Sequence, residues 1–88
     1  MLIALEDVGR TIGLVLGRRE VTADERLTED LGAESIDLLN VMVTLEQKYG
    51  VSIDESAMAV VSTVRDLYDL VLKSPHVAIP PADPARST

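Results

Sequence analysis

The apolar residues of segment 35–49 recur at spacings of three and four, and this pattern restricts the fold more than any other feature of the chain. An α-helix turns by about 100° per residue, so residues spaced in this way gather within a sector of roughly 100° on one face. Gly50 follows directly and can end a helix in the left-handed conformation. The pattern predicts a helix over 35–49, with a core face formed by Leu38, Val41, Met42, Leu45 and Tyr49.

A similar pattern lies nearer the N-terminus. Residues 3–16 carry apolar side chains at helical spacing and stop before Gly17, so they predict a first helix. Gly13 weakens this helix without abolishing it. After the helix predicted over 35–49, the segment 51–53 alternates too briefly to form a strand, and we expect it to place two apolar side chains beneath the helices.

Two shorter helices are predicted in the C-terminal half. Residues 55–60 are sufficient for one or two turns. Thr63 and Asp66 have the spacing of a capping box and predict a helix over 64–72, whose inward residues are Leu67, Leu70 and Val71. The fold class is therefore predicted to be all-α, a four-helix bundle of three main helices and one short helix.

The connection between the first two long helices is itself long. Residues 18–34 contain nine charged side chains, few apolar ones and no strand alternation. Leu27 and Leu31 are the residues expected to attach this loop to the core. A loop of this length in a domain of this size is more often functional than idle.

The chain changes character at Ser74. Four prolines lie between Pro75 and Pro84, which excludes a helix there, and little apolar surface is available for packing. We therefore predict a domain over 1–73 and a flexible proline-rich tail over 74–88. His76, the only histidine of the chain, has no companion ligand and is expected to be solvated.

Composition excludes several functional classes. The chain has no cysteine, so a thiol could reach it only on a prosthetic group. A net charge of −7 disfavours nucleic acid and anionic membranes and favours protein partners with basic patches. The apolar run at the N-terminus is too short for membrane insertion, so we expect a cytoplasmic location. We also expect the protein to be a monomer. Metal-ligand spacings and catalytic constellations are absent from the sequence, so no catalytic or metal residues are predicted.

Ser35 lies where the charged loop becomes the second helix. A serine at this position commonly caps a helix, because its oxygen accepts a hydrogen bond from a backbone N–H group that has no partner in the helix. Ser35 is framed here by Leu-Gly-Ala-Glu before it and by Ile-Asp-Leu-Leu after it. The helix does not need all of these apolar residues for its core face.

The segment from Leu27 to Tyr49, which begins Leu-Thr-Glu-Asp-Leu-Gly-Ala-Glu-Ser-Ile-Asp-Leu-Leu, resembles the acyl carrier protein family. Weaker matches extend from about Val8 to Val71. The resemblance implies that Ser35 carries a phosphopantetheine arm, donated by coenzyme A and attached by a phosphopantetheinyl transferase. It also implies a carrier without enzymatic activity, which holds acyl groups as thioesters and presents them to acyl-loading and acyl-processing enzymes of fatty acid, polyketide or related biosynthesis. Glu34 departs from the family, in which aspartate most often precedes the serine.

A second apolar stripe is predicted on the same helix, formed by Ile36, Leu39 and Val43 and centred more than about 100° from the core face. One interpretation is that this helix buries both stripes, against the long loop and the third helix. The other is that the stripe stays exposed and docks partner enzymes, with Val61 completing it. Glu34, Asp37 and Glu46 are predicted to pair there with basic residues of a partner.

Two alternatives to acyl carriage remain open. The same residues could carry an aminoacyl or peptidyl group, although such carriers more often lack the Leu-Thr-Glu-Asp-Leu-Gly segment. An unmodified helical protein–protein interaction module with the carrier fold would account for Glu34, but not for the serine at position 35.

Overall fold

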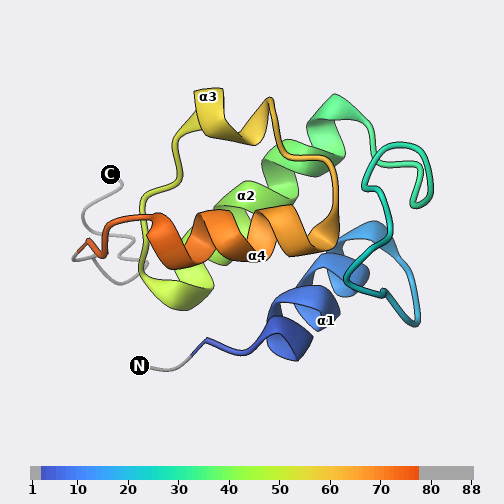
Figure 1. Cartoon of the computed structure of the whole chain (residues 1–88), viewed down its shortest axis with the longest axis horizontal. Helices are drawn as coiled ribbons and strands as arrows, with labels where there is room; N and C mark the ends of the chain where they lie inside the picture. Colours follow the sequence, from blue (N-terminus) through green and yellow to red (C-terminus); the bar gives the residue numbers. More distant parts are fainter. Residues whose placement is uncertain (1–2, 78–88) are drawn as a thin grey trace, which may run out of the picture.

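The computed structural model describes residues 3–77 of the 88-residue chain. It contains four helices, α1 (Leu5–Leu16), α2 (Ser35–Tyr49), α3 (Glu55–Met58) and α4 (Val64–Lys73). The three long helices pack together, and the short α3 lies above α2 and α4 in the view of Figure 1. The only β-type pairings in the described part are two isolated bridges. The predicted all-α bundle and the long loop between α1 and α2 are confirmed.

Glycines end both of the first two helices, as the sequence predicts. Gly17 and Gly50 have φ values of 72° and 66°, in the left-handed region that a side chain disfavours. The start of α1 differs from the prediction, because Ala4 is extended and the helix begins at Leu5. Ile3 is nevertheless buried, and its carbonyl accepts a hydrogen bond of 2.9 Å from the Tyr68 hydroxyl on α4.

The core gathers where α1, α2 and α4 meet. It contains Val8, Ile12, Val41, Met42, Leu45, Tyr49, Val64, Leu67 and Val71 from the three long helices, together with Leu27, Leu31, Val51 and Ile53 from the connections. Leu27 and Leu31 attach the long loop as predicted, and the segment 51–53 buries its two apolar side chains. Of the predicted core face of α2, only Leu38 is partly exposed.

The long loop also supplies hydrogen-bond acceptors for the first N–H groups of α4. The first N–H groups of a helix have no partner within it. Here the Val64 and Arg65 N–H groups donate to the carbonyls of Glu25 and Ala23, at 3.1 and 2.9 Å. The predicted capping box is present as well, with Thr63 and Asp66 each accepting from the other's backbone N–H. Accepting from the Thr63 N–H, and then from the Ser62 N–H, lowers the pKa of the Asp66 carboxyl.

Gly13 lies in the middle of α1 because the loop passes too close for a side chain. A Cβ at Gly13 would lie 3.0 Å from the Arg18 carbonyl oxygen and 3.2 Å from Val21 Cγ2. The Arg18 N–H donates to the Gly13 carbonyl at 2.7 Å, which fixes the loop against the helix. At Gly9, the Cβ would meet the Val21 carbonyl oxygen at an ordinary 3.6 Å.

These distances predict opposite effects for the same substitution at two glycines. Gly9→Ala should stabilise the fold by up to about 1 kcal/mol, because alanine forms helix more readily. Gly13→Ala should destabilise it by about 1–2 kcal/mol, because the cost of overpacking exceeds that gain. Urea denaturation of both variants measures the difference. A stabilised Gly13→Ala protein would show that the loop moves away without cost.

The predicted boundary between domain and tail at Lys73 needs correction. Ser74 is buried, and its hydroxyl donates to the Leu70 carbonyl at 2.7 Å. The Pro75 carbonyl accepts from the Ser52 N–H at 3.0 Å, and the Val77 N–H donates to the Gly50 carbonyl at 2.8 Å. The chain is therefore hydrogen-bonded to the domain as far as Val77, since a proline forbids a helix but keeps its carbonyl as an acceptor. Residues 78–88 lie outside the described part, and their flexibility stays a prediction.

Two truncations test this correction. Removal of residues 74–88 should lower the thermal midpoint by about 8 °C or more, because four hydrogen bonds worth about 0.5–1.5 kcal/mol each are lost from a small domain. Removal of residues 78–88 alone should leave the midpoint within about 1 °C, as expected for solvated chain. Circular dichroism melting compares the three chains. Equal midpoints for all three would restore the boundary at Lys73.

Candidate functional site

Ser35 is the first residue of α2 and does not cap it. The N-cap is Glu34, which is extended, and its N–H donates to Asp37 Oδ2 at 2.9 Å. Ser35 is exposed, and its hydroxyl makes no hydrogen bond with any other residue between 3 and 77. The interpretation of Ser35 as a cap therefore fails. Its hydroxyl is accessible to another molecule.

The loop before Ser35 is fixed by hydrogen bonds between its own residues. The Ala33 N–H donates to the Leu27 carbonyl, and the Asp30 carboxylate accepts from the Arg26 N–H, at 2.9 and 2.8 Å. Gly32 has a φ of 69°, which a residue with a side chain would adopt only with strain. The loop therefore presents Ser35 in a defined position at the start of α2.

A pocket opens between α2 and α3 beside Ser35. Its volume is about 180 Å³, and its lining consists of Ser35, Leu38, Leu39, Met42, Glu55, Met58 and Ala59. Two of these residues are methionines, whose flexible side chains adapt to the shape of an apolar ligand. A group attached to the hydroxyl would thus start at the edge of an apolar pocket. The sequence could not indicate this pocket, because it depends on where α3 lies.

The second apolar stripe of α2 is exposed. The exposed fractions are 59% for Ile36, 44% for Leu39 and 39% for Val43. These three residues are called the α2 apolar surface below. The interpretation that α2 buries both of its stripes is therefore wrong. The surface begins beside Ser35 and follows the helix away from it.

The acidic residues predicted to dock a partner differ in how they are engaged. Glu34 is exposed, with its side chain at the start of α2. The Asp37 carboxylate accepts from the Glu34 N–H, as described above. Glu46 Oε2 accepts from the Ile53 N–H at 2.8 Å. Two of the three carboxylates therefore already have roles within the fold, and a docking role for any of them stays a prediction.

Val61 lies differently from the prediction. It is half-buried and packs against the core, whereas its neighbour Val60 is 81% exposed. The sequence could not separate the two, because α3 is only four residues long and provides no periodicity from which to assign faces. Val60 is therefore the better candidate for a contact outside the molecule.

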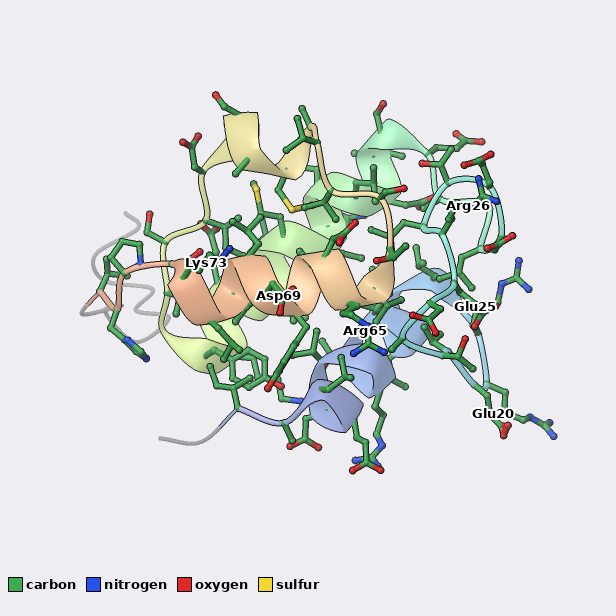
Figure 2. The ribbon with its side chains drawn as sticks, viewed as in Figure 1. Glu20, Glu25, Arg26, Arg65, Asp69 and Lys73 are labelled. Carbon is green, nitrogen blue, oxygen red and sulfur yellow. The ribbon has the colours of Figure 1, made fainter. Side chains whose placement is uncertain are left out.

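The outer face of α4 has a different character from that of α2. Figure 2 shows Arg65, Asp69 and Lys73 following one another along α4, on the face turned towards the viewer. Their charges alternate at helical spacing, as in an ordinary solvated face. The contrast makes α2 the better candidate for an apolar contact with a partner.

The site lacks the means to activate its own nucleophile. No side-chain base forms a hydrogen bond to the Ser35 hydroxyl within residues 3–77. Over the same residues, no group of three or more histidines, cysteines or carboxylates could hold a metal ion. A serine without a hydrogen-bonded base is a weak nucleophile, so an enzyme must act on Ser35 if this residue is to be modified. No helix among the described residues is long and apolar enough to cross a membrane.

Comparison with known proteins agrees with this geometry. Residues 6–71 match the family model described as "Phosphopantetheine attachment site". The chain is 35% identical over 54 residues to an acyl carrier protein of Thermotoga maritima, covering 61% of this chain and 67% of that one. It is 34% identical to an acyl carrier protein of Nitratidesulfovibrio vulgaris, covering 66% of this chain and 76% of that one.

Solved structures give the same result. The acetyl actinorhodin acyl carrier protein from Streptomyces coelicolor superposes with a TM-score of 0.66 and 32% identity, covering 81% of this chain and 88% of that one. Sequence, fold and site point to one assignment. The chain belongs to the acyl carrier protein family, whose members are carriers rather than enzymes and hold a covalently attached phosphopantetheine group.

Proposed function

We propose that Ser35 is the residue of this chain that carries phosphopantetheine, and that the arm holds acyl groups as thioesters. The observation that carries the proposal is the exposed Ser35 hydroxyl, which has no hydrogen-bond partner among the described residues and lies at the edge of the α2–α3 pocket. A hydroxyl engaged as a cap would have to break a hydrogen bond first. The Ser35 hydroxyl does not.

Attachment requires a transferase. The bond between Ser35 Oγ and phosphorus forms, the bond between the two phosphates of coenzyme A breaks, and adenosine bisphosphate leaves. A base of the transferase takes the serine proton, because Ser35 has no base of its own. The resulting phosphodiester lies at the N-terminus of α2, where the helix dipole favours an anion by about 0.3–1 kcal/mol. Glu34 and Asp37 oppose part of this effect.

The pocket supports a role in sheltering the cargo. Its apolar walls are Leu38, Leu39 and Met42 on α2 and Met58 on α3. An apolar chain gains about 0.8 kcal/mol for each CH₂ group that it buries. Burial at this place would keep an acyl chain from water until a partner enzyme draws it out.

The partners proposed for this carrier are a phosphopantetheinyl transferase and acyl-loading and acyl-processing enzymes. They dock on the α2 apolar surface, next to the residue that they act on. Glu34, Asp37 and Glu46 add negative charge to this surface, and the net charge of −7 favours basic partners and disfavours self-association. We infer a monomer that works in the cytoplasm.

The pathway is proposed to be fatty acid, polyketide or related biosynthesis. The solved relatives with more than 30% identity include carriers named for actinorhodin and for mupirocin biosynthesis. The curated relatives are named simply as acyl carrier proteins. These names favour an acyl cargo over an aminoacyl or peptidyl one.

Intact mass tests the assignment. Incubation with coenzyme A and a broad-specificity phosphopantetheinyl transferase should add one phosphopantetheine per chain, and fragmentation should locate it on Ser35. The mass of the protein purified from its own host would also identify the cargo. A chain that resists several transferases would favour the unmodified interaction module.

A further inference from the structure

Helix α3 has few contacts of its own to hold it in place. It has four residues, and only Met58 among them is buried. An isolated helix of this length is not stable, so its position depends on the segments that precede and follow it. Because Glu55, Met58 and Ala59 form one side of the α2–α3 pocket, these segments determine the width of the pocket.

The segment before α3 is tied to α2 by a carboxylate. Glu46 Oε2 accepts from the Ile53 N–H at 2.8 Å, a distance typical of a charge-assisted hydrogen bond. Ile53 directly precedes Asp54, the N-cap of α3, whose side chain accepts from the Ser56 N–H at 2.9 Å. This hydrogen bond therefore connects the last turn of α2 to the residue before the N-cap of α3.

The same segment is held from its other side by the chain after α4. The Ser52 N–H donates to the Pro75 carbonyl, and the Val77 N–H donates to the Gly50 carbonyl. Residues 50–52 are therefore held by these backbone hydrogen bonds and by the buried Val51 side chain. Ile53 is the next residue, and its N–H is bound by the Glu46 side chain. A substitution of Glu46 would thus change the last hydrogen bond before α3, while the other hydrogen bonds and the burial of the Ile53 side chain stay in place.

We propose that Glu46 is a positioning residue, whose carboxylate holds Ile53 and so keeps α3 at the distance from α2 that an apolar acyl chain requires. This inference rests on the proposed function, because it concerns the cargo of the arm on Ser35. It gives Glu46 a role within the carrier itself, in addition to any contact with a partner. Two conservative substitutions separate the hydrogen bond from the charge.

Glu46→Gln retains an oxygen that can accept at the same reach and loses the charge. Glu46→Asp retains the charge but is one methylene shorter, so it cannot reach Ile53 with the same geometry. Glu20→Asp is the matched control, because Glu20 is exposed and has no hydrogen bond to any described residue. Figure 2 shows Glu20 at the outer edge of the loop between α1 and α2, far from α3.

Each variant is loaded to completion with a broad-specificity transferase, checked by mass, and prepared with a free arm, an acetyl arm and an octanoyl arm. In the parent chain, octanoyl should raise the thermal midpoint by roughly 4–8 °C over the free arm, and acetyl should not. Glu46→Gln and Glu20→Asp should keep this shift, and Glu46→Asp should lose at least half of it. Amide exchange at Ile53 should accelerate about tenfold in Glu46→Asp only.

Comparing the three arms within one variant cancels any general change in stability. A purely structural role of Glu46 would lower the midpoints of the free, acetyl and octanoyl forms equally. A Glu46→Asp chain with the full octanoyl shift would overturn the inference and leave the proposed function intact. So would a parent chain that is loaded but shows no octanoyl shift. A parent chain that cannot be loaded would overturn the proposed function, and the inference with it.

Discussion

Ser35→Ala is expected to accept no phosphopantetheine at all, while the parent chain accepts one group per molecule. The hydroxyl oxygen is the atom that forms the bond to phosphorus, and alanine has none. The loss should be complete, because no other serine lies at the start of α2 beside the pocket. Intact mass after incubation with coenzyme A and a transferase measures it directly.

The stability of Ser35→Ala is expected to be unchanged. The hydroxyl makes no hydrogen bond within the described residues, so its removal should alter the free energy of unfolding by less than about 0.5 kcal/mol. Ser56→Ala is the matched control, since Ser56 is an exposed serine near the start of α3 and should leave modification complete. Modification of Ser35→Ala at the parent rate would refute the assignment of the site.

The sequence predicted those parts of the fold that depend on side-chain periodicity. The spacing of apolar residues located α1, α2 and α4, and the two glycines located the ends of the first two helices. The exposure of the α2 apolar surface was one of two open interpretations, because spacing places residues on a face without showing what covers it. Burial in the structure decided between them.

Features that depend on the backbone could not be predicted in this way. The pairing of Pro75 and Val77 with the segment after α2 uses main-chain groups, which every residue type carries. The pocket depends on the position of a four-residue helix, and its anchor at Glu46 joins residues that are seven apart in the sequence. Gly13 appeared to weaken its helix, whereas the structure shows that the passing loop leaves no space for a side chain.

The α2 apolar surface can be tested best at Ile36. Val43 shares a groove with Val51 and Val77, and Leu39 lines the pocket, so a charge at either position could affect packing as well as docking. Ile36 is more exposed than both. It also lies in the first turn of α2, where a carboxylate is favourable to the helix dipole.

Ile36→Asp should therefore unfold at a denaturant midpoint close to that of the parent, with a change within about 0.5 kcal/mol. By contrast, the rate at which a transferase attaches phosphopantetheine to this variant should fall strongly. A buried apolar contact beside Ser35 would be replaced by a charge, so kcat/KM for a phosphopantetheinyl transferase should fall about tenfold or more. Leu14→Asp is the control, because Leu14 on α1 is 77% exposed and lies outside the α2 apolar surface. Leu14→Asp should keep the parent kcat/KM, and its free energy of unfolding should fall by no more than about 1 kcal/mol, because a carboxylate in the last turn of α1 opposes the helix dipole. If Ile36→Asp is stable and modified at the parent rate, the α2 apolar surface does not dock the transferase, and its exposure needs another explanation.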